Sequence, residues 1–90
     1  MVKLHDNRQL SRFELAEQGA VAFANYRLEA GQLLIDHVES PDALRGTGAA
    51  GRLMEGLVEE ARSAGLRLVP HCSYAQAWVQ RHPDETRGVV

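Results

Sequence analysis

The stretch that decides the fold runs from Leu33 to Ala64: LLIDHV, then ESPDAL, then RGTGAAG opening RLMEGLVEEARSA. An apolar strand and a loop lead here into a long amphipathic helix. Three glycines, Gly46, Gly48 and Gly51, crowd the junction, although each weakens a helix by about 1 kcal/mol relative to alanine. Glycines there let a ligand reach first-turn amides, which lack intrahelical partners and lie at the positive end of the helix dipole. The pattern predicts an anion site, for example for a pyrophosphate; the alternative is a tight loop whose glycines only satisfy turn geometry.

The residues after these glycines predict a helix from about Gly48 to Ala64, followed by a short buried strand, Leu66–Val69. Leu53, Leu57 and Ala61 recur at the spacing of one helical face. Gly65 suits the C-terminal cap. Strand, helix and strand in this order imply a parallel strand pair with a right-handed crossover.

The residues before Leu33 predict an antiparallel meander. Apolar and polar residues alternate over Arg12–Glu17 and again over Ala20–Leu28, and glycine-bearing turns lead on to the strand Leu33–Val38. In this alternation one face of the second run carries Ala22, Ala24, Tyr26 and Leu28. We also expect an edge strand over Val2–His5.

The residues after the last strand predict a break and a second helix. Pro70 removes one donor from the strand ladder, so the strand should part from its neighbour near His71 and Cys72. A shorter helix is expected over about Tyr74–Arg81, and the tail Asp84–Val90 is expected to be loosely held. The whole chain, 1–90, is thus predicted to be one α+β domain: a meander, a β-α-β unit and a short C-terminal helix.

Composition excludes several classes of protein. With 44% apolar and 24% charged residues the 90-residue chain is an ordinary globular one. A net charge of −2 gives no reason to expect nucleic acid. No apolar run is long enough to span a bilayer. The first residues lack a signal-peptide core and Cys72 is the one cysteine, so we expect a cytoplasmic location.

The glycines match GxGxxG over residues 46–51, but the context argues against a dinucleotide or P-loop site. In a Rossmann unit the first glycine follows the strand directly, and an acidic residue about 20 positions on binds the ribose. Here Glu39–Arg45 intervene, and Leu66–Cys72 contain no carboxylate. A P-loop needs a lysine after its last glycine, and the chain's one lysine is Lys3.

A set of spaced motifs resembles the GCN5-related N-acetyltransferases. Arg45, Gly48 and Ala50 match the acyl-coenzyme A loop of that family, and they stand before an amphipathic helix and after a meander. The nearest likeness is to small single-domain members that carry a histidine and a proline near the fourth strand, a Pro-x-Cys-Ser segment and a His-Pro pair. The corresponding residues here are His37, Pro41, Leu44–Ala50, Pro70–Tyr74, His82 and Pro83.

The resemblance implies a cofactor site for acetyl-CoA or coenzyme A. Backbone amides from Gly46 to Ala50 would hold the pyrophosphate, and Arg45 would lie over the phosphates. Arg52 could add charge or be a solvated helix residue. The pantetheine arm would enter the gap between the fourth and fifth strands. The implied cofactor-binding residues are Val38, Arg45, Gly46, Thr47, Gly48, Ala49, Ala50, Cys72 and Tyr74.

The candidate catalytic residues are His37 and Cys72. An imidazole titrates near neutral pH and could accept a proton from an amine, but in strict alternation His37 shares a face with Leu33 and Ile35, where a structural role is as plausible. Cys72 could carry an acyl group or adjoin the thioester, or be an inert small residue. Tyr74 could protonate the departing thiolate. A zinc site of His37, His71 and Cys72 lacks ligand-pair spacing.

Two functions follow from these residues. The first is acetyl transfer from acetyl-CoA to an amine of unknown identity. The second is a non-catalytic module that binds coenzyme A or acetyl-CoA, or an accessory interaction protein. The sequence leaves the acceptor, the acyl chain length and the oligomeric state open.

Overall fold

Five strands form one sheet in chain order in the computed structural model, which describes residues 3–90. Neighbouring strands from β1 to β4 are antiparallel, and β4 and β5 are parallel. This arrangement confirms the predicted α+β fold class. The strands are β1 His5–Asn7, β2 Arg12–Glu17, β3 Ala20–Glu29, β4 Gln32–Glu39 and β5 Arg67–Pro70.

The first strand lies later than the sequence pattern indicated. We expected an edge strand over Val2–His5, but β1 begins at His5, and its pairing with β2 runs from His5 opposite Glu14 to Asn7 opposite Arg12. Val2 lies outside the described residues.

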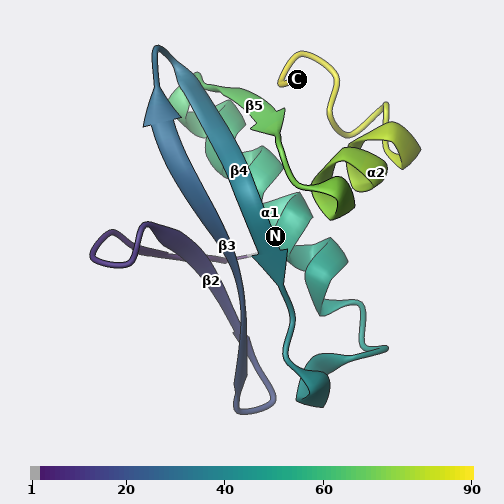
Figure 1. Ribbon diagram of the computed structural model, residues 1–90. Helices are drawn as coiled ribbons and strands as arrows, with labels where there is room; N and C mark the ends of the chain where they lie inside the picture. The colour runs from purple at the N-terminus through teal and green to yellow at the C-terminus, as the bar shows by residue number, and fades with distance from the viewer. Residues whose placement is uncertain (1–2) are drawn as a thin grey trace.

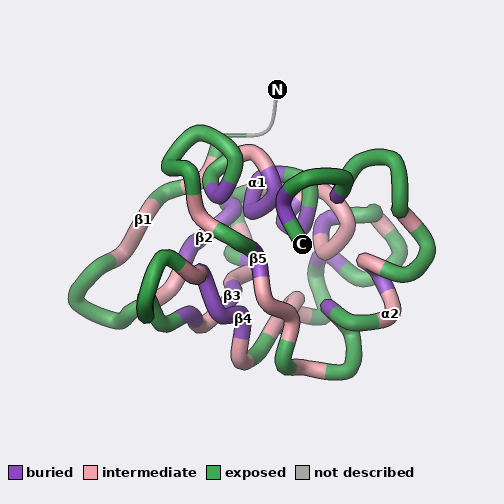
Figure 2. Tube along the Cα trace, turned by 90° about the horizontal axis from the view of Figure 1, so that it is seen from above, coloured by how far each residue is buried: buried purple, intermediate pink, exposed green. Residues whose placement is uncertain are grey.

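One long helix, α1 (Ala49–Ala64), connects β4 to β5 and covers one face of the sheet (Figure 1). Seen from above, the buried residues gather between this helix and the strands (Figure 2). Leu53, Met54, Leu57 and Ala61 of α1 are fully buried against core residues of the sheet such as Ile35. The amphipathic stripe read from the sequence is therefore the face that forms the core.

A β-bulge in β4 overturns the expected orientation of His37. Tyr26 of β3 pairs with Ile35, but the preceding Asn25 pairs with His37, so that Asp36 is an extra residue. An extra residue shifts the side-chain alternation by one position. His37 consequently lies on the face opposite Ile35, away from α1, where its side chain is 54% exposed.

The break after β5 agrees with the sequence prediction. The last paired residues of β4 and β5 are Ile35 and Pro70, and the next two amides, of His71 and Cys72, both donate to the Ile35 carbonyl. The chain then turns into α2 (Ser73–Arg81), beside the β5 edge of the sheet (Figure 1). A gap in the β4–β5 ladder therefore opens where β4 continues alone.

The prediction of a loose C-terminal tail is wrong. Thr86 is 1% exposed, and its hydroxyl donates to the carbonyl of His82. Val89 is buried in the main core, and its carbonyl accepts the amide hydrogen of Leu68 in β5. The tail protects the outer edge of β5, which would otherwise present unpaired backbone groups.

Neither helix within residues 3–90 combines the length and apolar character that crossing a bilayer requires.

Candidate functional site

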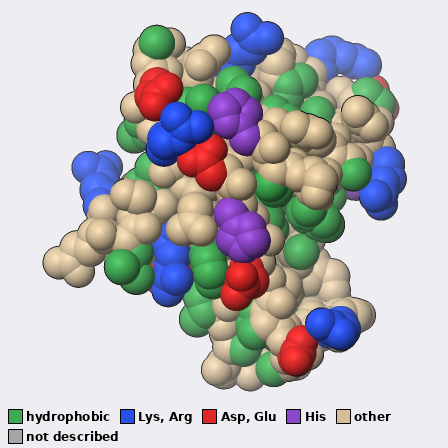
Figure 3. All heavy atoms as spheres, in the orientation of Figure 1, with side chains coloured by type: hydrophobic (Ala, Val, Ile, Leu, Met, Phe, Trp, Pro, Cys, Tyr) green, Lys and Arg blue, Asp and Glu red, His purple; other side chains and the backbone are tan. Residues whose placement is uncertain are grey.

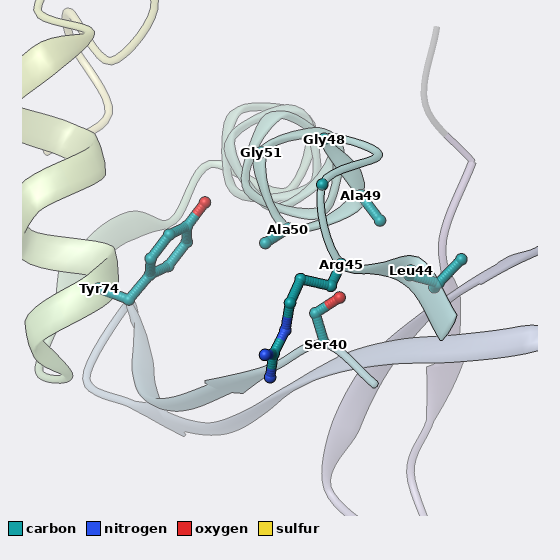
Figure 4. A pocket seen from close by; sticks show the side chains of 9 residues that line it. Ser40, Leu44, Arg45, Gly48, Ala49, Ala50, Gly51 and Tyr74 are labelled. Carbon is teal, nitrogen blue, oxygen red and sulfur yellow. The ribbon is translucent and has the colours of Figure 1, made fainter. Parts of the chain in front are cut away.

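A pocket of about 290 Å³ lies between the N-terminal end of α1 and the start of α2 (Figure 4). The loop between β4 and α1 forms one side, and Tyr74 of α2 forms the other (Figure 4). This loop contains a short 3-10 helix, Asp42–Leu44, before the glycines. The pocket is lined by Ser40, Leu44, Arg45, Gly46, Gly48, Ala49, Ala50, Gly51 and Tyr74.

Several backbone amides along this pocket are free to bind a ligand. Within residues 3–90, the amides of Gly46, Gly48, Ala50 and Gly51 donate to no protein acceptor. Only the amide of Ala49 among the pocket's helical residues is capped, by the Thr47 hydroxyl at 3.3 Å. Free amides at the N-terminal end of a 16-residue helix make a site for an anion.

Gly48 is the position where the loop depends on glycine. It precedes α1 as its N-cap residue with φ of 85°, in the left-handed region, which most side chains avoid. A Cβ atom there would also lie 3.0 Å from Nη1 of Arg52. Any larger residue at position 48 must therefore strain the backbone and displace Arg52.

Arg52 is paired within the protein, and its contacts hold the loop in place. Its guanidinium donates to both carboxylate oxygens of Glu17 in β2, at 2.8 and 2.7 Å, and to the carbonyl of Thr47 at 2.9 Å. Hydrogen bonding from Arg52 lowers the pKa of Glu17 below its ordinary value. A bidentate pair of this kind fixes geometry, so Arg52 anchors the loop to the sheet.

Arg45 is the cation available to a ligand in this pocket. Its side chain is 81% exposed, and it donates at 2.8 Å to Asp42, which is 91% exposed. Exposed pairs of this type contribute little stability, typically about 0–1 kcal/mol. The guanidinium can thus exchange Asp42 for an anionic group over the loop.

Tyr74 and Ser40 supply two hydroxyl groups. The Tyr74 ring projects from α2 toward the first turn of α1 (Figure 4). Burial raises the pKa of the Tyr74 phenol above its ordinary value. The phenol therefore keeps its proton at neutral pH and can donate it as a hydrogen bond.

His37 lies outside the pocket, on the open face of the sheet. Its Nε2 atom is 3.0 Å from a carboxylate oxygen of Glu39, and its ring lies 6.4 Å from that of Phe23. Histidine side chains are exposed on this face beside acidic and basic ones (Figure 3). Nδ1 of His71 lies 3.3 Å from Nη2 of Arg27 and 3.4 Å from a carboxylate oxygen of Asp36. An imidazole in this position is accessible to a molecule that approaches from the side opposite α1.

Cys72 also lies outside the pocket. It is the N-cap residue of α2, and its sulfur accepts the amide hydrogen of Ala75 at 3.3 Å. Its half-buried side chain packs against the core. Val38, another implied cofactor residue, pairs with Ala24 and is likewise half-buried against the core.

The structure therefore divides the sequence-predicted residues into groups. Arg45, Gly46, Gly48, Ala49, Ala50 and Tyr74 line one pocket, whereas Thr47 serves as a capping residue inside the loop. Val38, His37 and Cys72 stand near the place where β4 and β5 part. In the part of the chain that the structure describes, no three His, Cys, Asp or Glu side chains form a metal-binding group.

The predicted set of cofactor-binding residues omitted three residues of the pocket lining: Ser40, Leu44 and Gly51. Gly51 belongs to the glycine cluster but does not occupy a position of the acyl-coenzyme A pattern. A Cβ atom at this position would be 3.7 Å from Nε1 of Trp78. Gly51 lies in the first turn of α1, which packs against α2 at this point.

Comparison with known proteins points to one family. The sequence pattern of the family described as GCN5-related N-acetyl-transferase matches residues 12–89. The fold is similar to the solution structure of a "GCN5-like putative N-acetyltransferase" from Staphylococcus aureus, with a TM-score of 0.73 and 26% identity over 98% of this chain and 86% of that one. A search of curated proteins found no match.

Proposed function

Because the chain belongs to the GCN5-related N-acetyltransferase family, we propose that it transfers an acetyl group from acetyl-CoA to an amine. The observation that carries this proposal is the set of free amides on the glycine pocket at the start of α1. Their number suits a pyrophosphate, which offers several anionic oxygens close together.

Different residues would bind different parts of the cofactor. The amides of Gly46, Gly48 and Ala50 would bind the pyrophosphate, with Arg45 over it. The pantetheine arm would follow the backbone near Val38 into the gap between β4 and α2, with the thioester close to Cys72. Acetyl-CoA would supply an activated acyl group whose leaving group is a thiolate.

The chemistry needs two proton-transfer groups. His37, on the open face, would accept a proton from the attacking amine as the new C–N bond forms. When the C–S bond breaks, Tyr74 would return a proton to the sulfur, since burial keeps the phenol protonated. Cys72 could instead take the acetyl group first by thiol exchange and then pass it to the amine.

A non-catalytic acetyl-CoA-binding module is the second candidate. It is favoured by the absence of His37 and Cys72 from the pocket lining and by the capping role of the Cys72 sulfur. Both candidates require the same cofactor site. They differ in whether the acetyl group leaves the cofactor.

Calorimetric titration with acetyl-CoA, with NADH as the control, tests the site. We expect saturable heat with acetyl-CoA alone; silence with acetyl-CoA would remove both candidates. Coenzyme A release would then be followed over a panel of amines for the wild type, His37→Ala and Cys72→Ala. His71→Ala provides a matched control on the open face.

Each pattern of turnover has a distinct meaning. Loss in His37→Ala but not in His71→Ala supports the assigned base. Loss in Cys72→Ala together with an acetyl adduct on Cys72 by intact mass supports the thiol route. Turnover that survives in both test variants refutes the assigned chemistry, and cofactor binding without turnover on any amine favours the module.

A further inference from the structure

A second cavity lies at the other end of α1, where the helix stops before the sheet does. Leu28 of β3 pairs with Leu33 on the core face, yet Leu28 is 60% exposed. Leu28 thus lies on the predicted face with Tyr26, but it is not covered as Tyr26 is. Because α1 ends at Ala64, this end of the core face has no helix over it. A cavity of about 160 Å³ remains here between Leu28, Leu33, Leu66 and Ala64.

The inner wall of this cavity is part of the rigid core. Phe13 and Tyr26 are 6% and 9% exposed, and their ring centroids are 4.7 Å apart. The Tyr26 hydroxyl donates to a carboxylate oxygen of Asp6 at 2.6 Å. This hydrogen bond ties β1 to β3 and fixes the aromatic wall, so the apolar space persists without a ligand.

The charges at the rim favour a cation. Glu60 of α1 lines the cavity and forms no ion pair with any residue from 3 to 90. Asp6 also lines it, and the arginine that pairs with it among residues 3–90, Arg8, is 87% exposed. The C-terminal end of α1 adds the negative end of a helix dipole. One free carboxylate and this dipole thus face an apolar space with one solvated arginine beside it.

We propose that this cavity binds a small molecule with an apolar ring or branched chain and a single ammonium group. The cavity is smaller than the roughly 300 Å³ or more of drug-sized sites, which limits the ligand to about eight non-hydrogen atoms. The apolar part contacts Phe13, Tyr26 and Leu28, and the ammonium group donates to Glu60.

The cavity is independent of the glycine pocket. The two share no lining residue. They lie at opposite ends of a 16-residue helix, which at 1.5 Å per residue is about 24 Å long. Failure of acetyl-CoA binding would therefore leave this proposal untouched, and the reverse also holds.

A titration followed by amide NMR shifts tests the proposal with cyclohexylmethylamine as the probe. We expect saturable shifts at Leu28 and Leu66 with a dissociation constant of about 1 mM, a usual affinity for a ligand of this size. Cyclohexanecarboxylate and cyclohexylmethanol, which share the ring, should bind at least about tenfold more weakly. Equal binding of the three probes, shifts confined to residues 45–51, or no saturation would each overturn the proposal.

Variants locate the site. Ala64→Leu fills the cavity from the last turn of α1 and should abolish binding, while urea denaturation and circular dichroism report that the fold is intact. Glu60→Gln should weaken the binding of cyclohexylmethylamine about fivefold and leave the binding of cyclohexylmethanol unchanged. Glu59→Gln, one residue away and outside the cavity lining, is the matched control. Unchanged affinity in both Ala64→Leu and Glu60→Gln would place the probe elsewhere and refute the assignment.

Discussion

A glycine in the left-handed conformation flanks each end of α1, but the backbone groups around the two glycines differ. Gly48 before the helix and Gly65 after it both adopt the left-handed conformation, with φ of 85° and 67°. At the C-terminal end, the amides of Gly65 and Leu66 donate to the carbonyls of Arg62 and Ala61. That pattern is a Schellman-type closure, which satisfies the helix from within.

The N-terminal end is left open instead. The amides of Gly46, Gly48, Ala50 and Gly51 have no protein acceptor among residues 3–90, and a pocket lies in front of them. The difference teaches that a glycine's conformation alone does not distinguish a cap from a binding loop. What distinguishes them is whether the neighbouring backbone groups already have partners.

The sharpest test of this contrast substitutes both glycines. Gly48→Glu should reduce acetyl-CoA affinity by at least about 100-fold, because a carboxylate would occupy the phosphate position and displace Arg52. Gly65→Ala should lower the free energy of unfolding by about 1 kcal/mol and leave affinity unchanged. Calorimetry and urea denaturation measure the two effects. Unchanged affinity in Gly48→Glu would contradict the assignment of the loop.

The second test concerns the tail, which packs beside the closed end of the helix. Val89→Ala should cost about 2 kcal/mol of stability, since two methyl groups leave the core. Its neighbour Val90 is 45% exposed, so Val90→Ala should change stability little. Urea denaturation of the two variants gives the comparison. Equal stability of the two variants would mean that the tail is not a part of the core.

The third test compares two arginines on α1. Arg52 binds Glu17 and the Thr47 carbonyl, whereas Arg62 binds the carbonyls of Glu85 and Arg87 in the tail. Arg52→Ala should lower the affinity for acetyl-CoA about fivefold, which is the effect of losing one hydrogen bond that orders the loop. Arg62→Ala should leave acetyl-CoA affinity as it is. Calorimetry on both variants shows whether the contacts of Arg52 support acetyl-CoA binding while those of Arg62 do not. Equal affinities of the two variants would contradict this assignment.

The smallest expected effect is a pH dependence at the open end. Hydrogen bonding from Arg52 lowers the pKa of Glu17 below its ordinary 4.5, so the pair stabilises the fold above about pH 4.5 and is lost as pH falls through the lowered pKa. The stability difference between wild type and Glu17→Gln should therefore vanish in acid. Denaturation at several pH values measures it. The difference between wild type and Arg62→Ala should not follow this curve, because Arg62 binds carbonyls that do not titrate there.

Local sequence patterns were reliable for the position of the glycine loop, the core face of α1 and the break after β5. The glycines and the stripe of Leu53, Leu57 and Ala61 predicted the loop and the core face of α1. Pro70 predicted the parting of β4 and β5. Each of these depends on backbone geometry or on a period within one element, which a short stretch of chain fixes by itself.

The sequence alone thus determined the fold class, the order of the elements and the loop that forms the pocket. Only the tertiary structure decided the face of His37, because a bulge depends on the pairing of two strands. It also decided that Arg52 anchors the loop, through a carboxylate 35 residues away in the chain. The burial of the tail follows from its packing on the edge of β5, and the exposure of Leu28 follows from where α1 ends over the sheet. Both are relations between elements that no local period contains.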